Sequence, residues 1–94
     1  MLIKHAETDL KGEFFIEENG SRLAEITFST RDAGILTILH TEVNESLRGQ
    51  NIGYKLVKEA ATFARKNHYK MVAKCTFAKA ILEKKKDEFQ DLLP

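Results

Sequence analysis

Hydrophobic and polar positions alternate along the first third of the chain in the manner of β-strands. Residues 13–18 and 22–28 flank the dipeptide Asn19-Gly20, which is the preferred pair for a tight type I′ turn. The pattern therefore predicts a β-hairpin. In its second strand Ala24, Ile26 and Phe28 recur every second residue, so they share one face.

The spacing of apolar residues changes from two to helical after residue 50. Residues 35–43 are mostly apolar, which favours a central strand, and they follow a turn at Asp32-Ala33-Gly34. Apolar residues then recur at helical spacing over residues 51–67. A short strand is predicted at residues 71–73, beside the strand at 35–43. A second helix is predicted at residues 77–83 and a third at residues 87–93.

We therefore predict a mixed α/β (α+β) central sheet with the element order β-β-β-α-β-α-α. Its β-α-β part implies a right-handed parallel crossover. Asp87 and Gln90 have the spacing of a capping box, so we expect Asp87 to cap the third helix.

Length and composition favour one domain over residues 1–94, in a reducing cytoplasmic compartment. The chain is 43% hydrophobic and 31% charged, and its one cysteine, Cys75, excludes an internal disulfide. The first residues turn polar at once, unlike a signal peptide, and no apolar run approaches the roughly 20 residues that span a bilayer. We expect no membrane partner and a monomer or weak dimer.

Charge is divided unevenly between the two halves of the chain. Residues 1–47 hold 4 Lys/Arg and 9 Asp/Glu, whereas residues 48–94 hold 11 Lys/Arg and 5 Asp/Glu. This division favours an anionic ligand on the second half and a cationic ligand near the first. Most of these lysines are also explained as an ordinary solvated surface.

The segment Leu47-Arg48-Gly49-Gln50-Asn51-Ile52-Gly53-Tyr54 connects the strand at 35–43 to the helix at 51–67. A polar, glycine-containing turn of this kind presents free backbone N–H groups at a helix N-terminus, where a partial positive charge favours anions. The segment therefore predicts an anion site, typically for phosphate. Taken alone, it is equally explained as a simple strand-to-helix turn.

With these residues the chain resembles a minimal member of the Gcn5-related N-acetyltransferase (GNAT) superfamily. Arg48 and Gly53 match the first and last positions of the motif Gln/Arg-x-x-Gly-x-Gly/Ala, and Asn51 replaces its middle glycine. Asn tolerates a positive φ better than most residues, so the turn can survive the replacement. The strings His40-Thr41-Glu42-Val43, Cys75-x-Phe77 and Asp91-Leu92 occur in the order and at the spacing of very short members with a Cys after the last core strand. The resemblance covers roughly residues 10–93. Lys74 and Lys86-Asp87 depart from the proline and the His-Pro pair that are common in those members.

The resemblance implies an acetyl-CoA site between two parallel strands that splay apart, the strand ending at Val43 and the strand at 71–73. Pantetheine would pair with backbone groups in the gap, and the pyrophosphate would rest on the N–H groups of residues 50–54. The implied cofactor-binding residues are Val43, Arg48, Gly49, Gln50, Asn51, Ile52, Gly53, Tyr54 and Cys75.

Three residues are candidates for the chemistry. Glu42 and His40 lie two apart on one strand and so point to one face, where either can act as the base that deprotonates an amine. The alternative is that Glu42 is an exposed charge at the strand end and that His40 is a satisfied histidine of the strand. Cys75 precedes a predicted helix start, which lowers the pKa of a thiol. It is a candidate nucleophile, a passive lining of the pantetheine gap or a small core residue.

Two further features bear on the ligands. Lys84-Lys85-Lys86 is either solvated surface or a contact for the 3′-phosphate of CoA. The histidines and the cysteine lack metal-ligand spacing, so we expect no metal.

The leading hypothesis is an acetyl-CoA-dependent N-acetyltransferase that acts on an unidentified amine, which is compatible with a peptide, a small polyamine or another small molecule. Residues 1–12 are too short for an N-terminal helix that walls the acceptor site, so we expect an open acceptor surface. The second hypothesis is a CoA-binding module with little or no catalysis. A third is a small nucleic-acid-binding domain, which is disfavoured by the net charge of +1 and by the lack of an aromatic stacking pattern in the strands.

Overall fold

The structure is a computed structural model that describes residues 2–94. Its elements are β1 (Lys4–Glu7), β2 (Lys11–Glu18), β3 (Ser21–Ser29), β4 (Ile35–Val43), the 3₁₀ turn η1 (Glu45–Leu47), α1 (Ile52–Lys66), β5 (Lys70–Ala73), α2 (Thr76–Lys84), α3 (Lys86–Phe89) and the 3₁₀ turn η2 (Gln90–Leu92).

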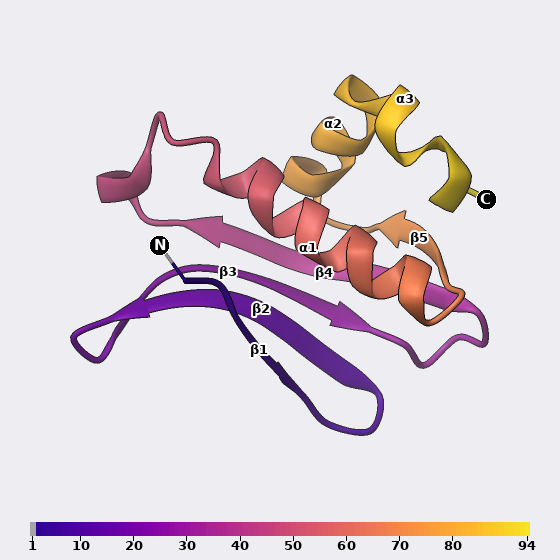
Figure 1. The fold of residues 1–94 in the computed structure, drawn as a ribbon, viewed down its shortest axis with the longest axis horizontal. Coiled ribbons are helices and arrows are strands. Elements are labelled where there is room, and N and C mark those ends of the chain that lie inside the picture. The colour runs from indigo at the N-terminus through magenta and orange to yellow at the C-terminus, as the bar shows by residue number, and fades with distance from the viewer. Residues whose placement is uncertain (1) are drawn as a thin grey trace.

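The strands of residues 2–94 form one five-stranded mixed sheet in the order β1-β2-β3-β4-β5 (Figure 1). The first four strands pair antiparallel, and β4 pairs parallel with β5 through the crossover helix α1. The predicted turn between β2 and β3 is confirmed, because Asn19 and Gly20 have φ angles of 51° and 79°. The predicted mixed sheet with its parallel crossover is therefore confirmed.

The N-terminal strand β1 was not predicted. All four of its residues are exposed, so the segment shows no alternation of apolar and polar positions. The strand is held by pairing with β2 and by His5, whose ring stacks on Phe14 at 4.4 Å between centroids and meets Phe63 edge-on at 5.2 Å. These contacts join residues far apart in the sequence, so no local pattern reveals them.

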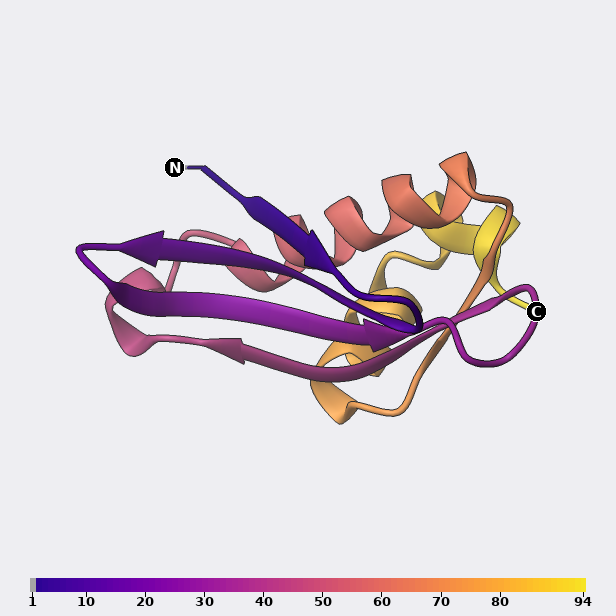
Figure 2. The same ribbon diagram turned by 90° about the horizontal axis from the view of Figure 1, so that it is seen from below.

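Helix α1 lies across one face of the sheet, and the hydrophobic core fills the space between them (Figures 1 and 2). The helix buries alanines at 60, 61 and 64, whose small side chains allow a close approach to the strands. The buried core residues are Phe14, Ile16, Ala24, Ile26, Phe28, Leu36, Ile38, Leu47, Ile52, Leu56, Val57, Ala60, Ala61, Ala64, Met71, Ala78, Leu82, Phe89 and Leu92.

The pairing between β4 and β5 covers only the first half of β4. Their pairing ends where Ile38 faces Ala73, and the Lys74 N–H then donates to the Ile38 carbonyl at 2.9 Å. Leu39 is an extra residue in the ladder with β3, because Thr27 pairs with His40 whereas Phe28 pairs with Ile38. β5 ends at Ala73, so residues 39–43 continue beside β3 with no β5 residue paired to them, and this side of β4 has no strand partner.

The C-terminal segment packs against α1 through polar contacts. The Arg65 guanidinium donates to both carboxylate oxygens of Asp91, at 2.9 and 3.0 Å, and the Lys70 ammonium donates to the Asp91 carbonyl at 2.8 Å. The predicted capping box is wrong. Helix α3 begins at Lys86, and Asp87 lies in its first turn without capping the helix. Among residues 2–94, no helix is long and apolar enough to cross a membrane.

Candidate functional site

The turn between β4 and α1 exposes backbone donors at the start of the helix. Gly49 has a φ of 84°, and Asn51 adopts the left-handed conformation with φ 59° and ψ 32°. Asn therefore does occupy the position of the missing glycine with a positive φ, as expected from its side chain. Within residues 2–94, the N–H groups of residues 51–54 donate to no carbonyl or side chain. Four such groups at the positive end of a 15-residue helix form a donor set for an anion.

Two small cavities flank this turn, and the ring of Phe77 contributes to both. The first, of about 220 Å³, is lined by Val43, Asn44, Arg48, Gly49, Gly53 and Phe77. The second, also of about 220 Å³, is lined by Asn51, Gly53, Tyr54, Phe77, Ile81, Lys84 and Lys85. Together the cavities are lined by the end of β4, the turn and residues along α2.

Phe77 is a site residue whose place sequence reasoning missed. Its side chain is 47% exposed, although it lies over Gly53 at the start of α1. A Cβ atom on Gly53 would come within 2.3 Å of the Phe77 ring. A side chain at position 53 would therefore have to displace the exposed Phe77 ring. The only sequence signal was the string Cys75-x-Phe77, which does not show where the ring points.

Cys75 lies between β5 and α2, at the N-cap position of α2, and is partly buried. Burial raises the pKa of its thiol, but the backbone N–H groups of Ala78 and Phe77 and the side chain of Thr41 outweigh burial and hold the pKa below its usual value. These contacts fall short of regular hydrogen bonds, because α2 has no side-chain cap and Thr41 Oγ1 has no hydrogen-bond partner within residues 2–94. The lowered pKa therefore reflects several weak interactions that favour the thiolate.

Cys75 lies near Thr41, on the part of β4 that β5 does not pair with. Thr41 is a β4 residue beyond the end of the β5 pairing, and it was not predicted as a site residue. Because side chains alternate along a strand, Thr41 points to the face opposite that of His40 and Glu42. The structure therefore brings Cys75 together with Thr41, whereas His40 and Glu42 project from the other face of β4.

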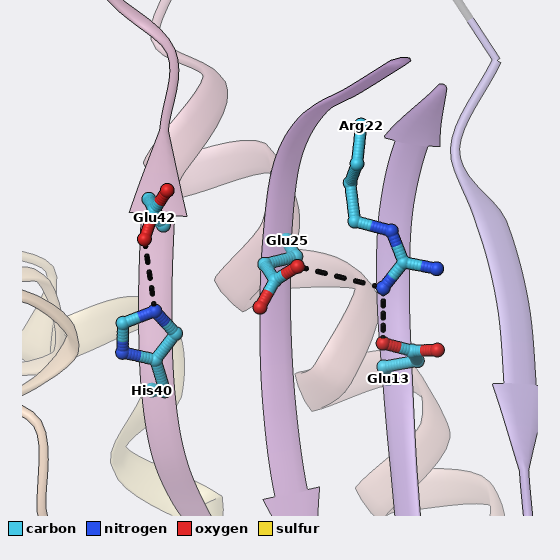
Figure 3. Close-up of polar contacts among 5 residues, drawn as sticks. All are labelled: Glu13, Arg22, Glu25, His40 and Glu42. Atoms are coloured by element: carbon cyan, nitrogen blue, oxygen red, sulfur yellow. Dashed lines mark hydrogen bonds and ion pairs between the residues drawn. The ribbon is translucent and has the colours of Figure 1, made fainter. Parts of the chain in front are cut away.

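His40 and Glu42 do share a face, as predicted. His40 Nε2 lies 3.3 Å from Glu42 Oε2, and the two side chains are 54% and 74% exposed. Figure 3 shows them on the side of the sheet away from α1, in the same view as Glu13, Arg22 and Glu25. The pair is therefore solvated and open to an approaching substrate.

Three further residues lie beside the turn, namely Arg48, Tyr54 and Lys85. Arg48 is exposed and lies 3.9 Å from Glu45, a loose ion pair that leaves its guanidinium free to contact an anion. The Tyr54 hydroxyl donates to both carboxylate oxygens of Glu88, at 2.6 and 2.8 Å, and this contact raises the pKa of Tyr54. Lys85 Nζ lies 5.0 Å from the centre of the Tyr54 ring.

The donor set fits a pyrophosphate and does not suggest a metal ion. Backbone N–H groups, an exposed arginine and nearby lysines are groups that bind phosphate oxygens. No group of three or more His, Cys, Asp or Glu within residues 2–94 is arranged to hold a metal.

The comparisons with known proteins establish the class. The family model described as GCN5-related N-acetyl-transferase matches residues 13–92, so the chain belongs to this family. The resemblance stated from the sequence is therefore confirmed. A search of curated proteins gave no match.

The solved structures support the same fold. The NMR structure of a GCN5-like N-acetyltransferase from Staphylococcus aureus is 38% identical, with a TM-score of 0.73, over 97% of this chain and 87% of that one. A ribosomal-protein-alanine N-acetyltransferase from Brucella melitensis is 15% identical, with a TM-score of 0.67, over 83% of this chain and 62% of that one. An acetyltransferase from Bacillus anthracis, solved in complex with acetyl coenzyme A, is 13% identical, with a TM-score of 0.59, over 70% of this chain and 39% of that one. At 15% and 13% identity, the last two show the fold alone.

Proposed function

We propose that this protein binds acetyl-CoA and transfers its acetyl group to an amine. The observation that carries the proposal is the set of four backbone N–H groups at residues 51–54, which lies beside the part of β4 that β5 does not pair with. Family membership supports the activity, and the B. anthracis structure shows that this fold holds acetyl-CoA in another protein.

In the proposed complex the pyrophosphate accepts hydrogen bonds from the N–H groups of residues 51–54, with Arg48 adding a charge. The N–H of Gln50, which was also predicted as a donor, is already bonded to the Leu47 carbonyl at 3.3 Å. Gly49 and Gly53 keep the backbone accessible, because neither carries a side chain over the turn. Pantetheine lies along the free edge of β4 near Val43, in the cavity that Phe77 borders. The thioester then reaches the point where β4 and β5 separate, beside Cys75 and Thr41.

The reaction requires a neutral amine. An alkyl ammonium with a pKa near 10.4 costs roughly 4.6 kcal/mol to deprotonate at pH 7. We propose that Glu42, or His40 beside it, accepts this proton, directly or through water. The amine nitrogen then attacks the thioester carbonyl and the C–S bond breaks. The CoA sulfur leaves with the electron pair, and the second proton of the nitrogen neutralises it.

We propose that Cys75 lines the position of the thioester. Its partial burial and its place between Thr41 and the start of α2 support a lining role. The lowered pKa also makes an acetyl-cysteine intermediate chemically possible, in which the thiolate displaces CoA before the amine displaces the thiolate. A mass increase of about 42 Da at Cys75 that forms and decays at the rate of turnover would replace the lining role with this covalent route.

A second candidate function is a CoA-binding module with little catalysis. The observation that favours it is the exposure of His40 and Glu42, at 54% and 74%, which leaves the candidate base in water. Titration calorimetry with acetyl-CoA tests binding, and release of free CoA thiol in the presence of an amine library tests transfer. We expect both to be positive. Binding without transfer would establish the module, and absence of binding would overturn both candidates.

We further propose that residues 1–94 act as one domain in the cytoplasm. The one cysteine is free rather than disulfide-bonded, which supports this location. We propose a monomer or weak dimer without nucleic-acid or membrane partners.

A further inference from the structure

A groove of about 460 Å³ crosses the face of the sheet that α1 leaves open. It is lined by Ala6, Glu7, Thr8, Lys11, Gly12, Glu13, Thr27, Phe28 and Leu39. This volume lies within the range of about 300–1,000 Å³ that is usual for small-molecule sites. The proposed function assigns no role to the groove.

The strand register explains the direction of the groove. Ala6 of β1 pairs with Glu13 of β2, Glu13 pairs with Thr27 of β3, and Thr27 pairs with His40 of β4. Directly paired residues point to the same face, so this row of side chains runs across four strands. The row ends at His40 and at the extra residue Leu39, where β5 leaves β4.

The groove is lined by Glu7, Glu13 and Lys11, so carboxylates outnumber ammonium groups there and favour a cationic ligand. The next row on the same face places Glu25 opposite Glu42, a pair of like charges that repel each other. Arg22 bonds to both Glu13 and Glu25, so one guanidinium serves two carboxylates (Figure 3). Within residues 2–94, Oε2 of Glu13 accepts no hydrogen bond, and the Glu13 side chain is 28% exposed. A carboxylate in this setting binds an ammonium group more strongly than a fully solvated one does.

Most of the surface that lines the groove is apolar. Ala6 and the 37% exposed side chain of Leu39 stand at its two sides, and Gly12 adds bare backbone. An alkyl chain fits such a surface, whereas a sugar or a peptide backbone would leave its polar groups unpaired.

We propose that this groove, defined by Ala6, Glu13, Thr27 and Leu39, binds the acetyl acceptor, and that the acceptor is an aliphatic amine carrying two or more ammonium groups. The inference rests on the proposed transferase function and adds the substrate class. One ammonium group is bound by Glu13. The other end of the chain reaches His40 and Glu42 at the end of the row, loses its proton there and becomes the nucleophile.

Matched substrates and matched variants test the proposal. The probes are 1,4-diaminobutane and 4-amino-1-butanol, which have the same length but differ in the charge at the far end. Glu13→Gln removes the carboxylate in the groove. Glu17→Gln removes a carboxylate from the same strand outside the groove, where Glu17 pairs with Lys4.

We expect kcat/KM for the diamine to exceed that for the amino alcohol by at least tenfold. Glu13→Gln should abolish this preference, whereas Glu17→Gln should retain it. Equal kcat/KM for the two probes in the unmodified protein, or equal effects of the two substitutions, would overturn the proposal while leaving the transferase function intact.

A binding measurement keeps the two proposals separable. If CoA binds but no amine is acetylated, the transferase function fails, and amide chemical shifts in the CoA complex test the groove directly. We then expect 1,4-diaminobutane, but not 4-amino-1-butanol, to shift the amides of Ala6, Glu13, Thr27 and Leu39. Unchanged amides at saturating diamine would overturn the groove as a cation site.

Discussion

The molecule contains two glycines that lie beneath a phenylalanine ring, one in the sheet and one at the proposed CoA site. Gly12 on β2 faces Phe28 on β3, and Gly53 on α1 faces Phe77 on α2; a Cβ atom on either glycine would come within 2.3 Å of the ring. The rings differ in their freedom to move, because Phe28 is 2% exposed and Phe77 is 47% exposed. Close packing of a ring on a glycine therefore occurs with an immobile ring in the sheet, Phe28, and with a movable ring that lines the cavities at the start of α1, Phe77.

The proposed CoA site and the groove on the open face of the sheet also differ in the groups that recognise charge. At the start of α1 the donors are main-chain N–H groups, whose positions depend on the φ angles of Gly49 and Asn51. On the open face of the sheet the charged groups are side chains, and their positions depend on strand register. Substitutions that alter the backbone should therefore affect the first site most, and changes of charge should affect the second.

The largest expected effect is at Gly53. Gly53→Pro removes one N–H donor and adds atoms beneath Phe77, whereas Gly53→Ala adds a Cβ but keeps the donor. A hydrogen bond to a charged group contributes about 1.5–3 kcal/mol, so we expect CoA to bind roughly 10- to 100-fold more weakly to Gly53→Pro than to Gly53→Ala by calorimetry. Equal affinities of the two variants, with circular dichroism confirming that both are folded, would remove this N–H from the phosphate site.

A substitution at Gly12 in the sheet should lower stability and leave CoA affinity nearly unchanged. Gly12→Ala forces a Cβ against the buried Phe28 ring, and overpacking of this kind typically costs about 1–3 kcal/mol. We expect urea unfolding to show this loss of stability, with CoA affinity changed less than about twofold. Gly53→Ala should lose less than about 1 kcal/mol, because Phe77 can move and alanine is the better helix former. If the two alanine variants lose the same stability, the distinction between fixed and adjustable rings is wrong.

Cys75 offers a test of its lowered pKa and of its distance from the ligand. Since the pKa of the folded thiol lies below its usual value, the thiolate persists to lower pH, and the rate of alkylation by iodoacetamide should rise at lower pH than in the urea-unfolded chain. Saturating CoA should slow alkylation at least fivefold if Cys75 lines the gap. A rate unchanged by CoA would exclude Cys75 from the site, and a pH midpoint above that of the unfolded chain would contradict the assigned pKa direction.

The smallest effect concerns Lys85 beside Tyr54. Lys85 lines the second cavity, so we propose that it contacts the 3′-phosphate of CoA. An exposed contact of this type contributes about 0.3–1 kcal/mol, which corresponds to a two- to fivefold preference for CoA over desphospho-CoA at low salt. Lys85→Gln should remove the preference, and Lys66→Gln at the other end of α1 should keep it. A preference that survives in Lys85→Gln would assign the contact to another group.

Sequence patterns predicted the parts of this structure that short-range geometry determines. The Asn19-Gly20 turn and the helix beginning at Ile52 depend on residues within a few positions, and Asn51 was expected to accept the positive φ that it has. Strand β1 was missed because only His5, through Phe14 and Phe63, ties it to the core face.

The main-chain part of the candidate site was predicted from the sequence. The contacts between segments distant in the sequence were not. The turn at residues 48–54 was visible in the sequence, whereas the position of the Phe77 ring over Gly53 depends on how α2 packs against α1. The nearness of Thr41 to Cys75 depends on where β4 and β5 separate. The groove on the open face requires the register of four strands, which no single segment of the sequence contains.

Backbone amide chemical shifts during a titration with acetyl-CoA report directly on the proposed pyrophosphate contact. We expect the N–H resonances of residues 51–54 to show the largest shifts and to saturate together, because these groups have no other acceptor in residues 2–94. Residues such as Glu25 on the open face of the sheet serve as the internal reference and should change little. Saturable binding that leaves the amides of residues 51–54 unchanged would exclude them as the pyrophosphate site, and no binding at millimolar acetyl-CoA would exclude the proposed function.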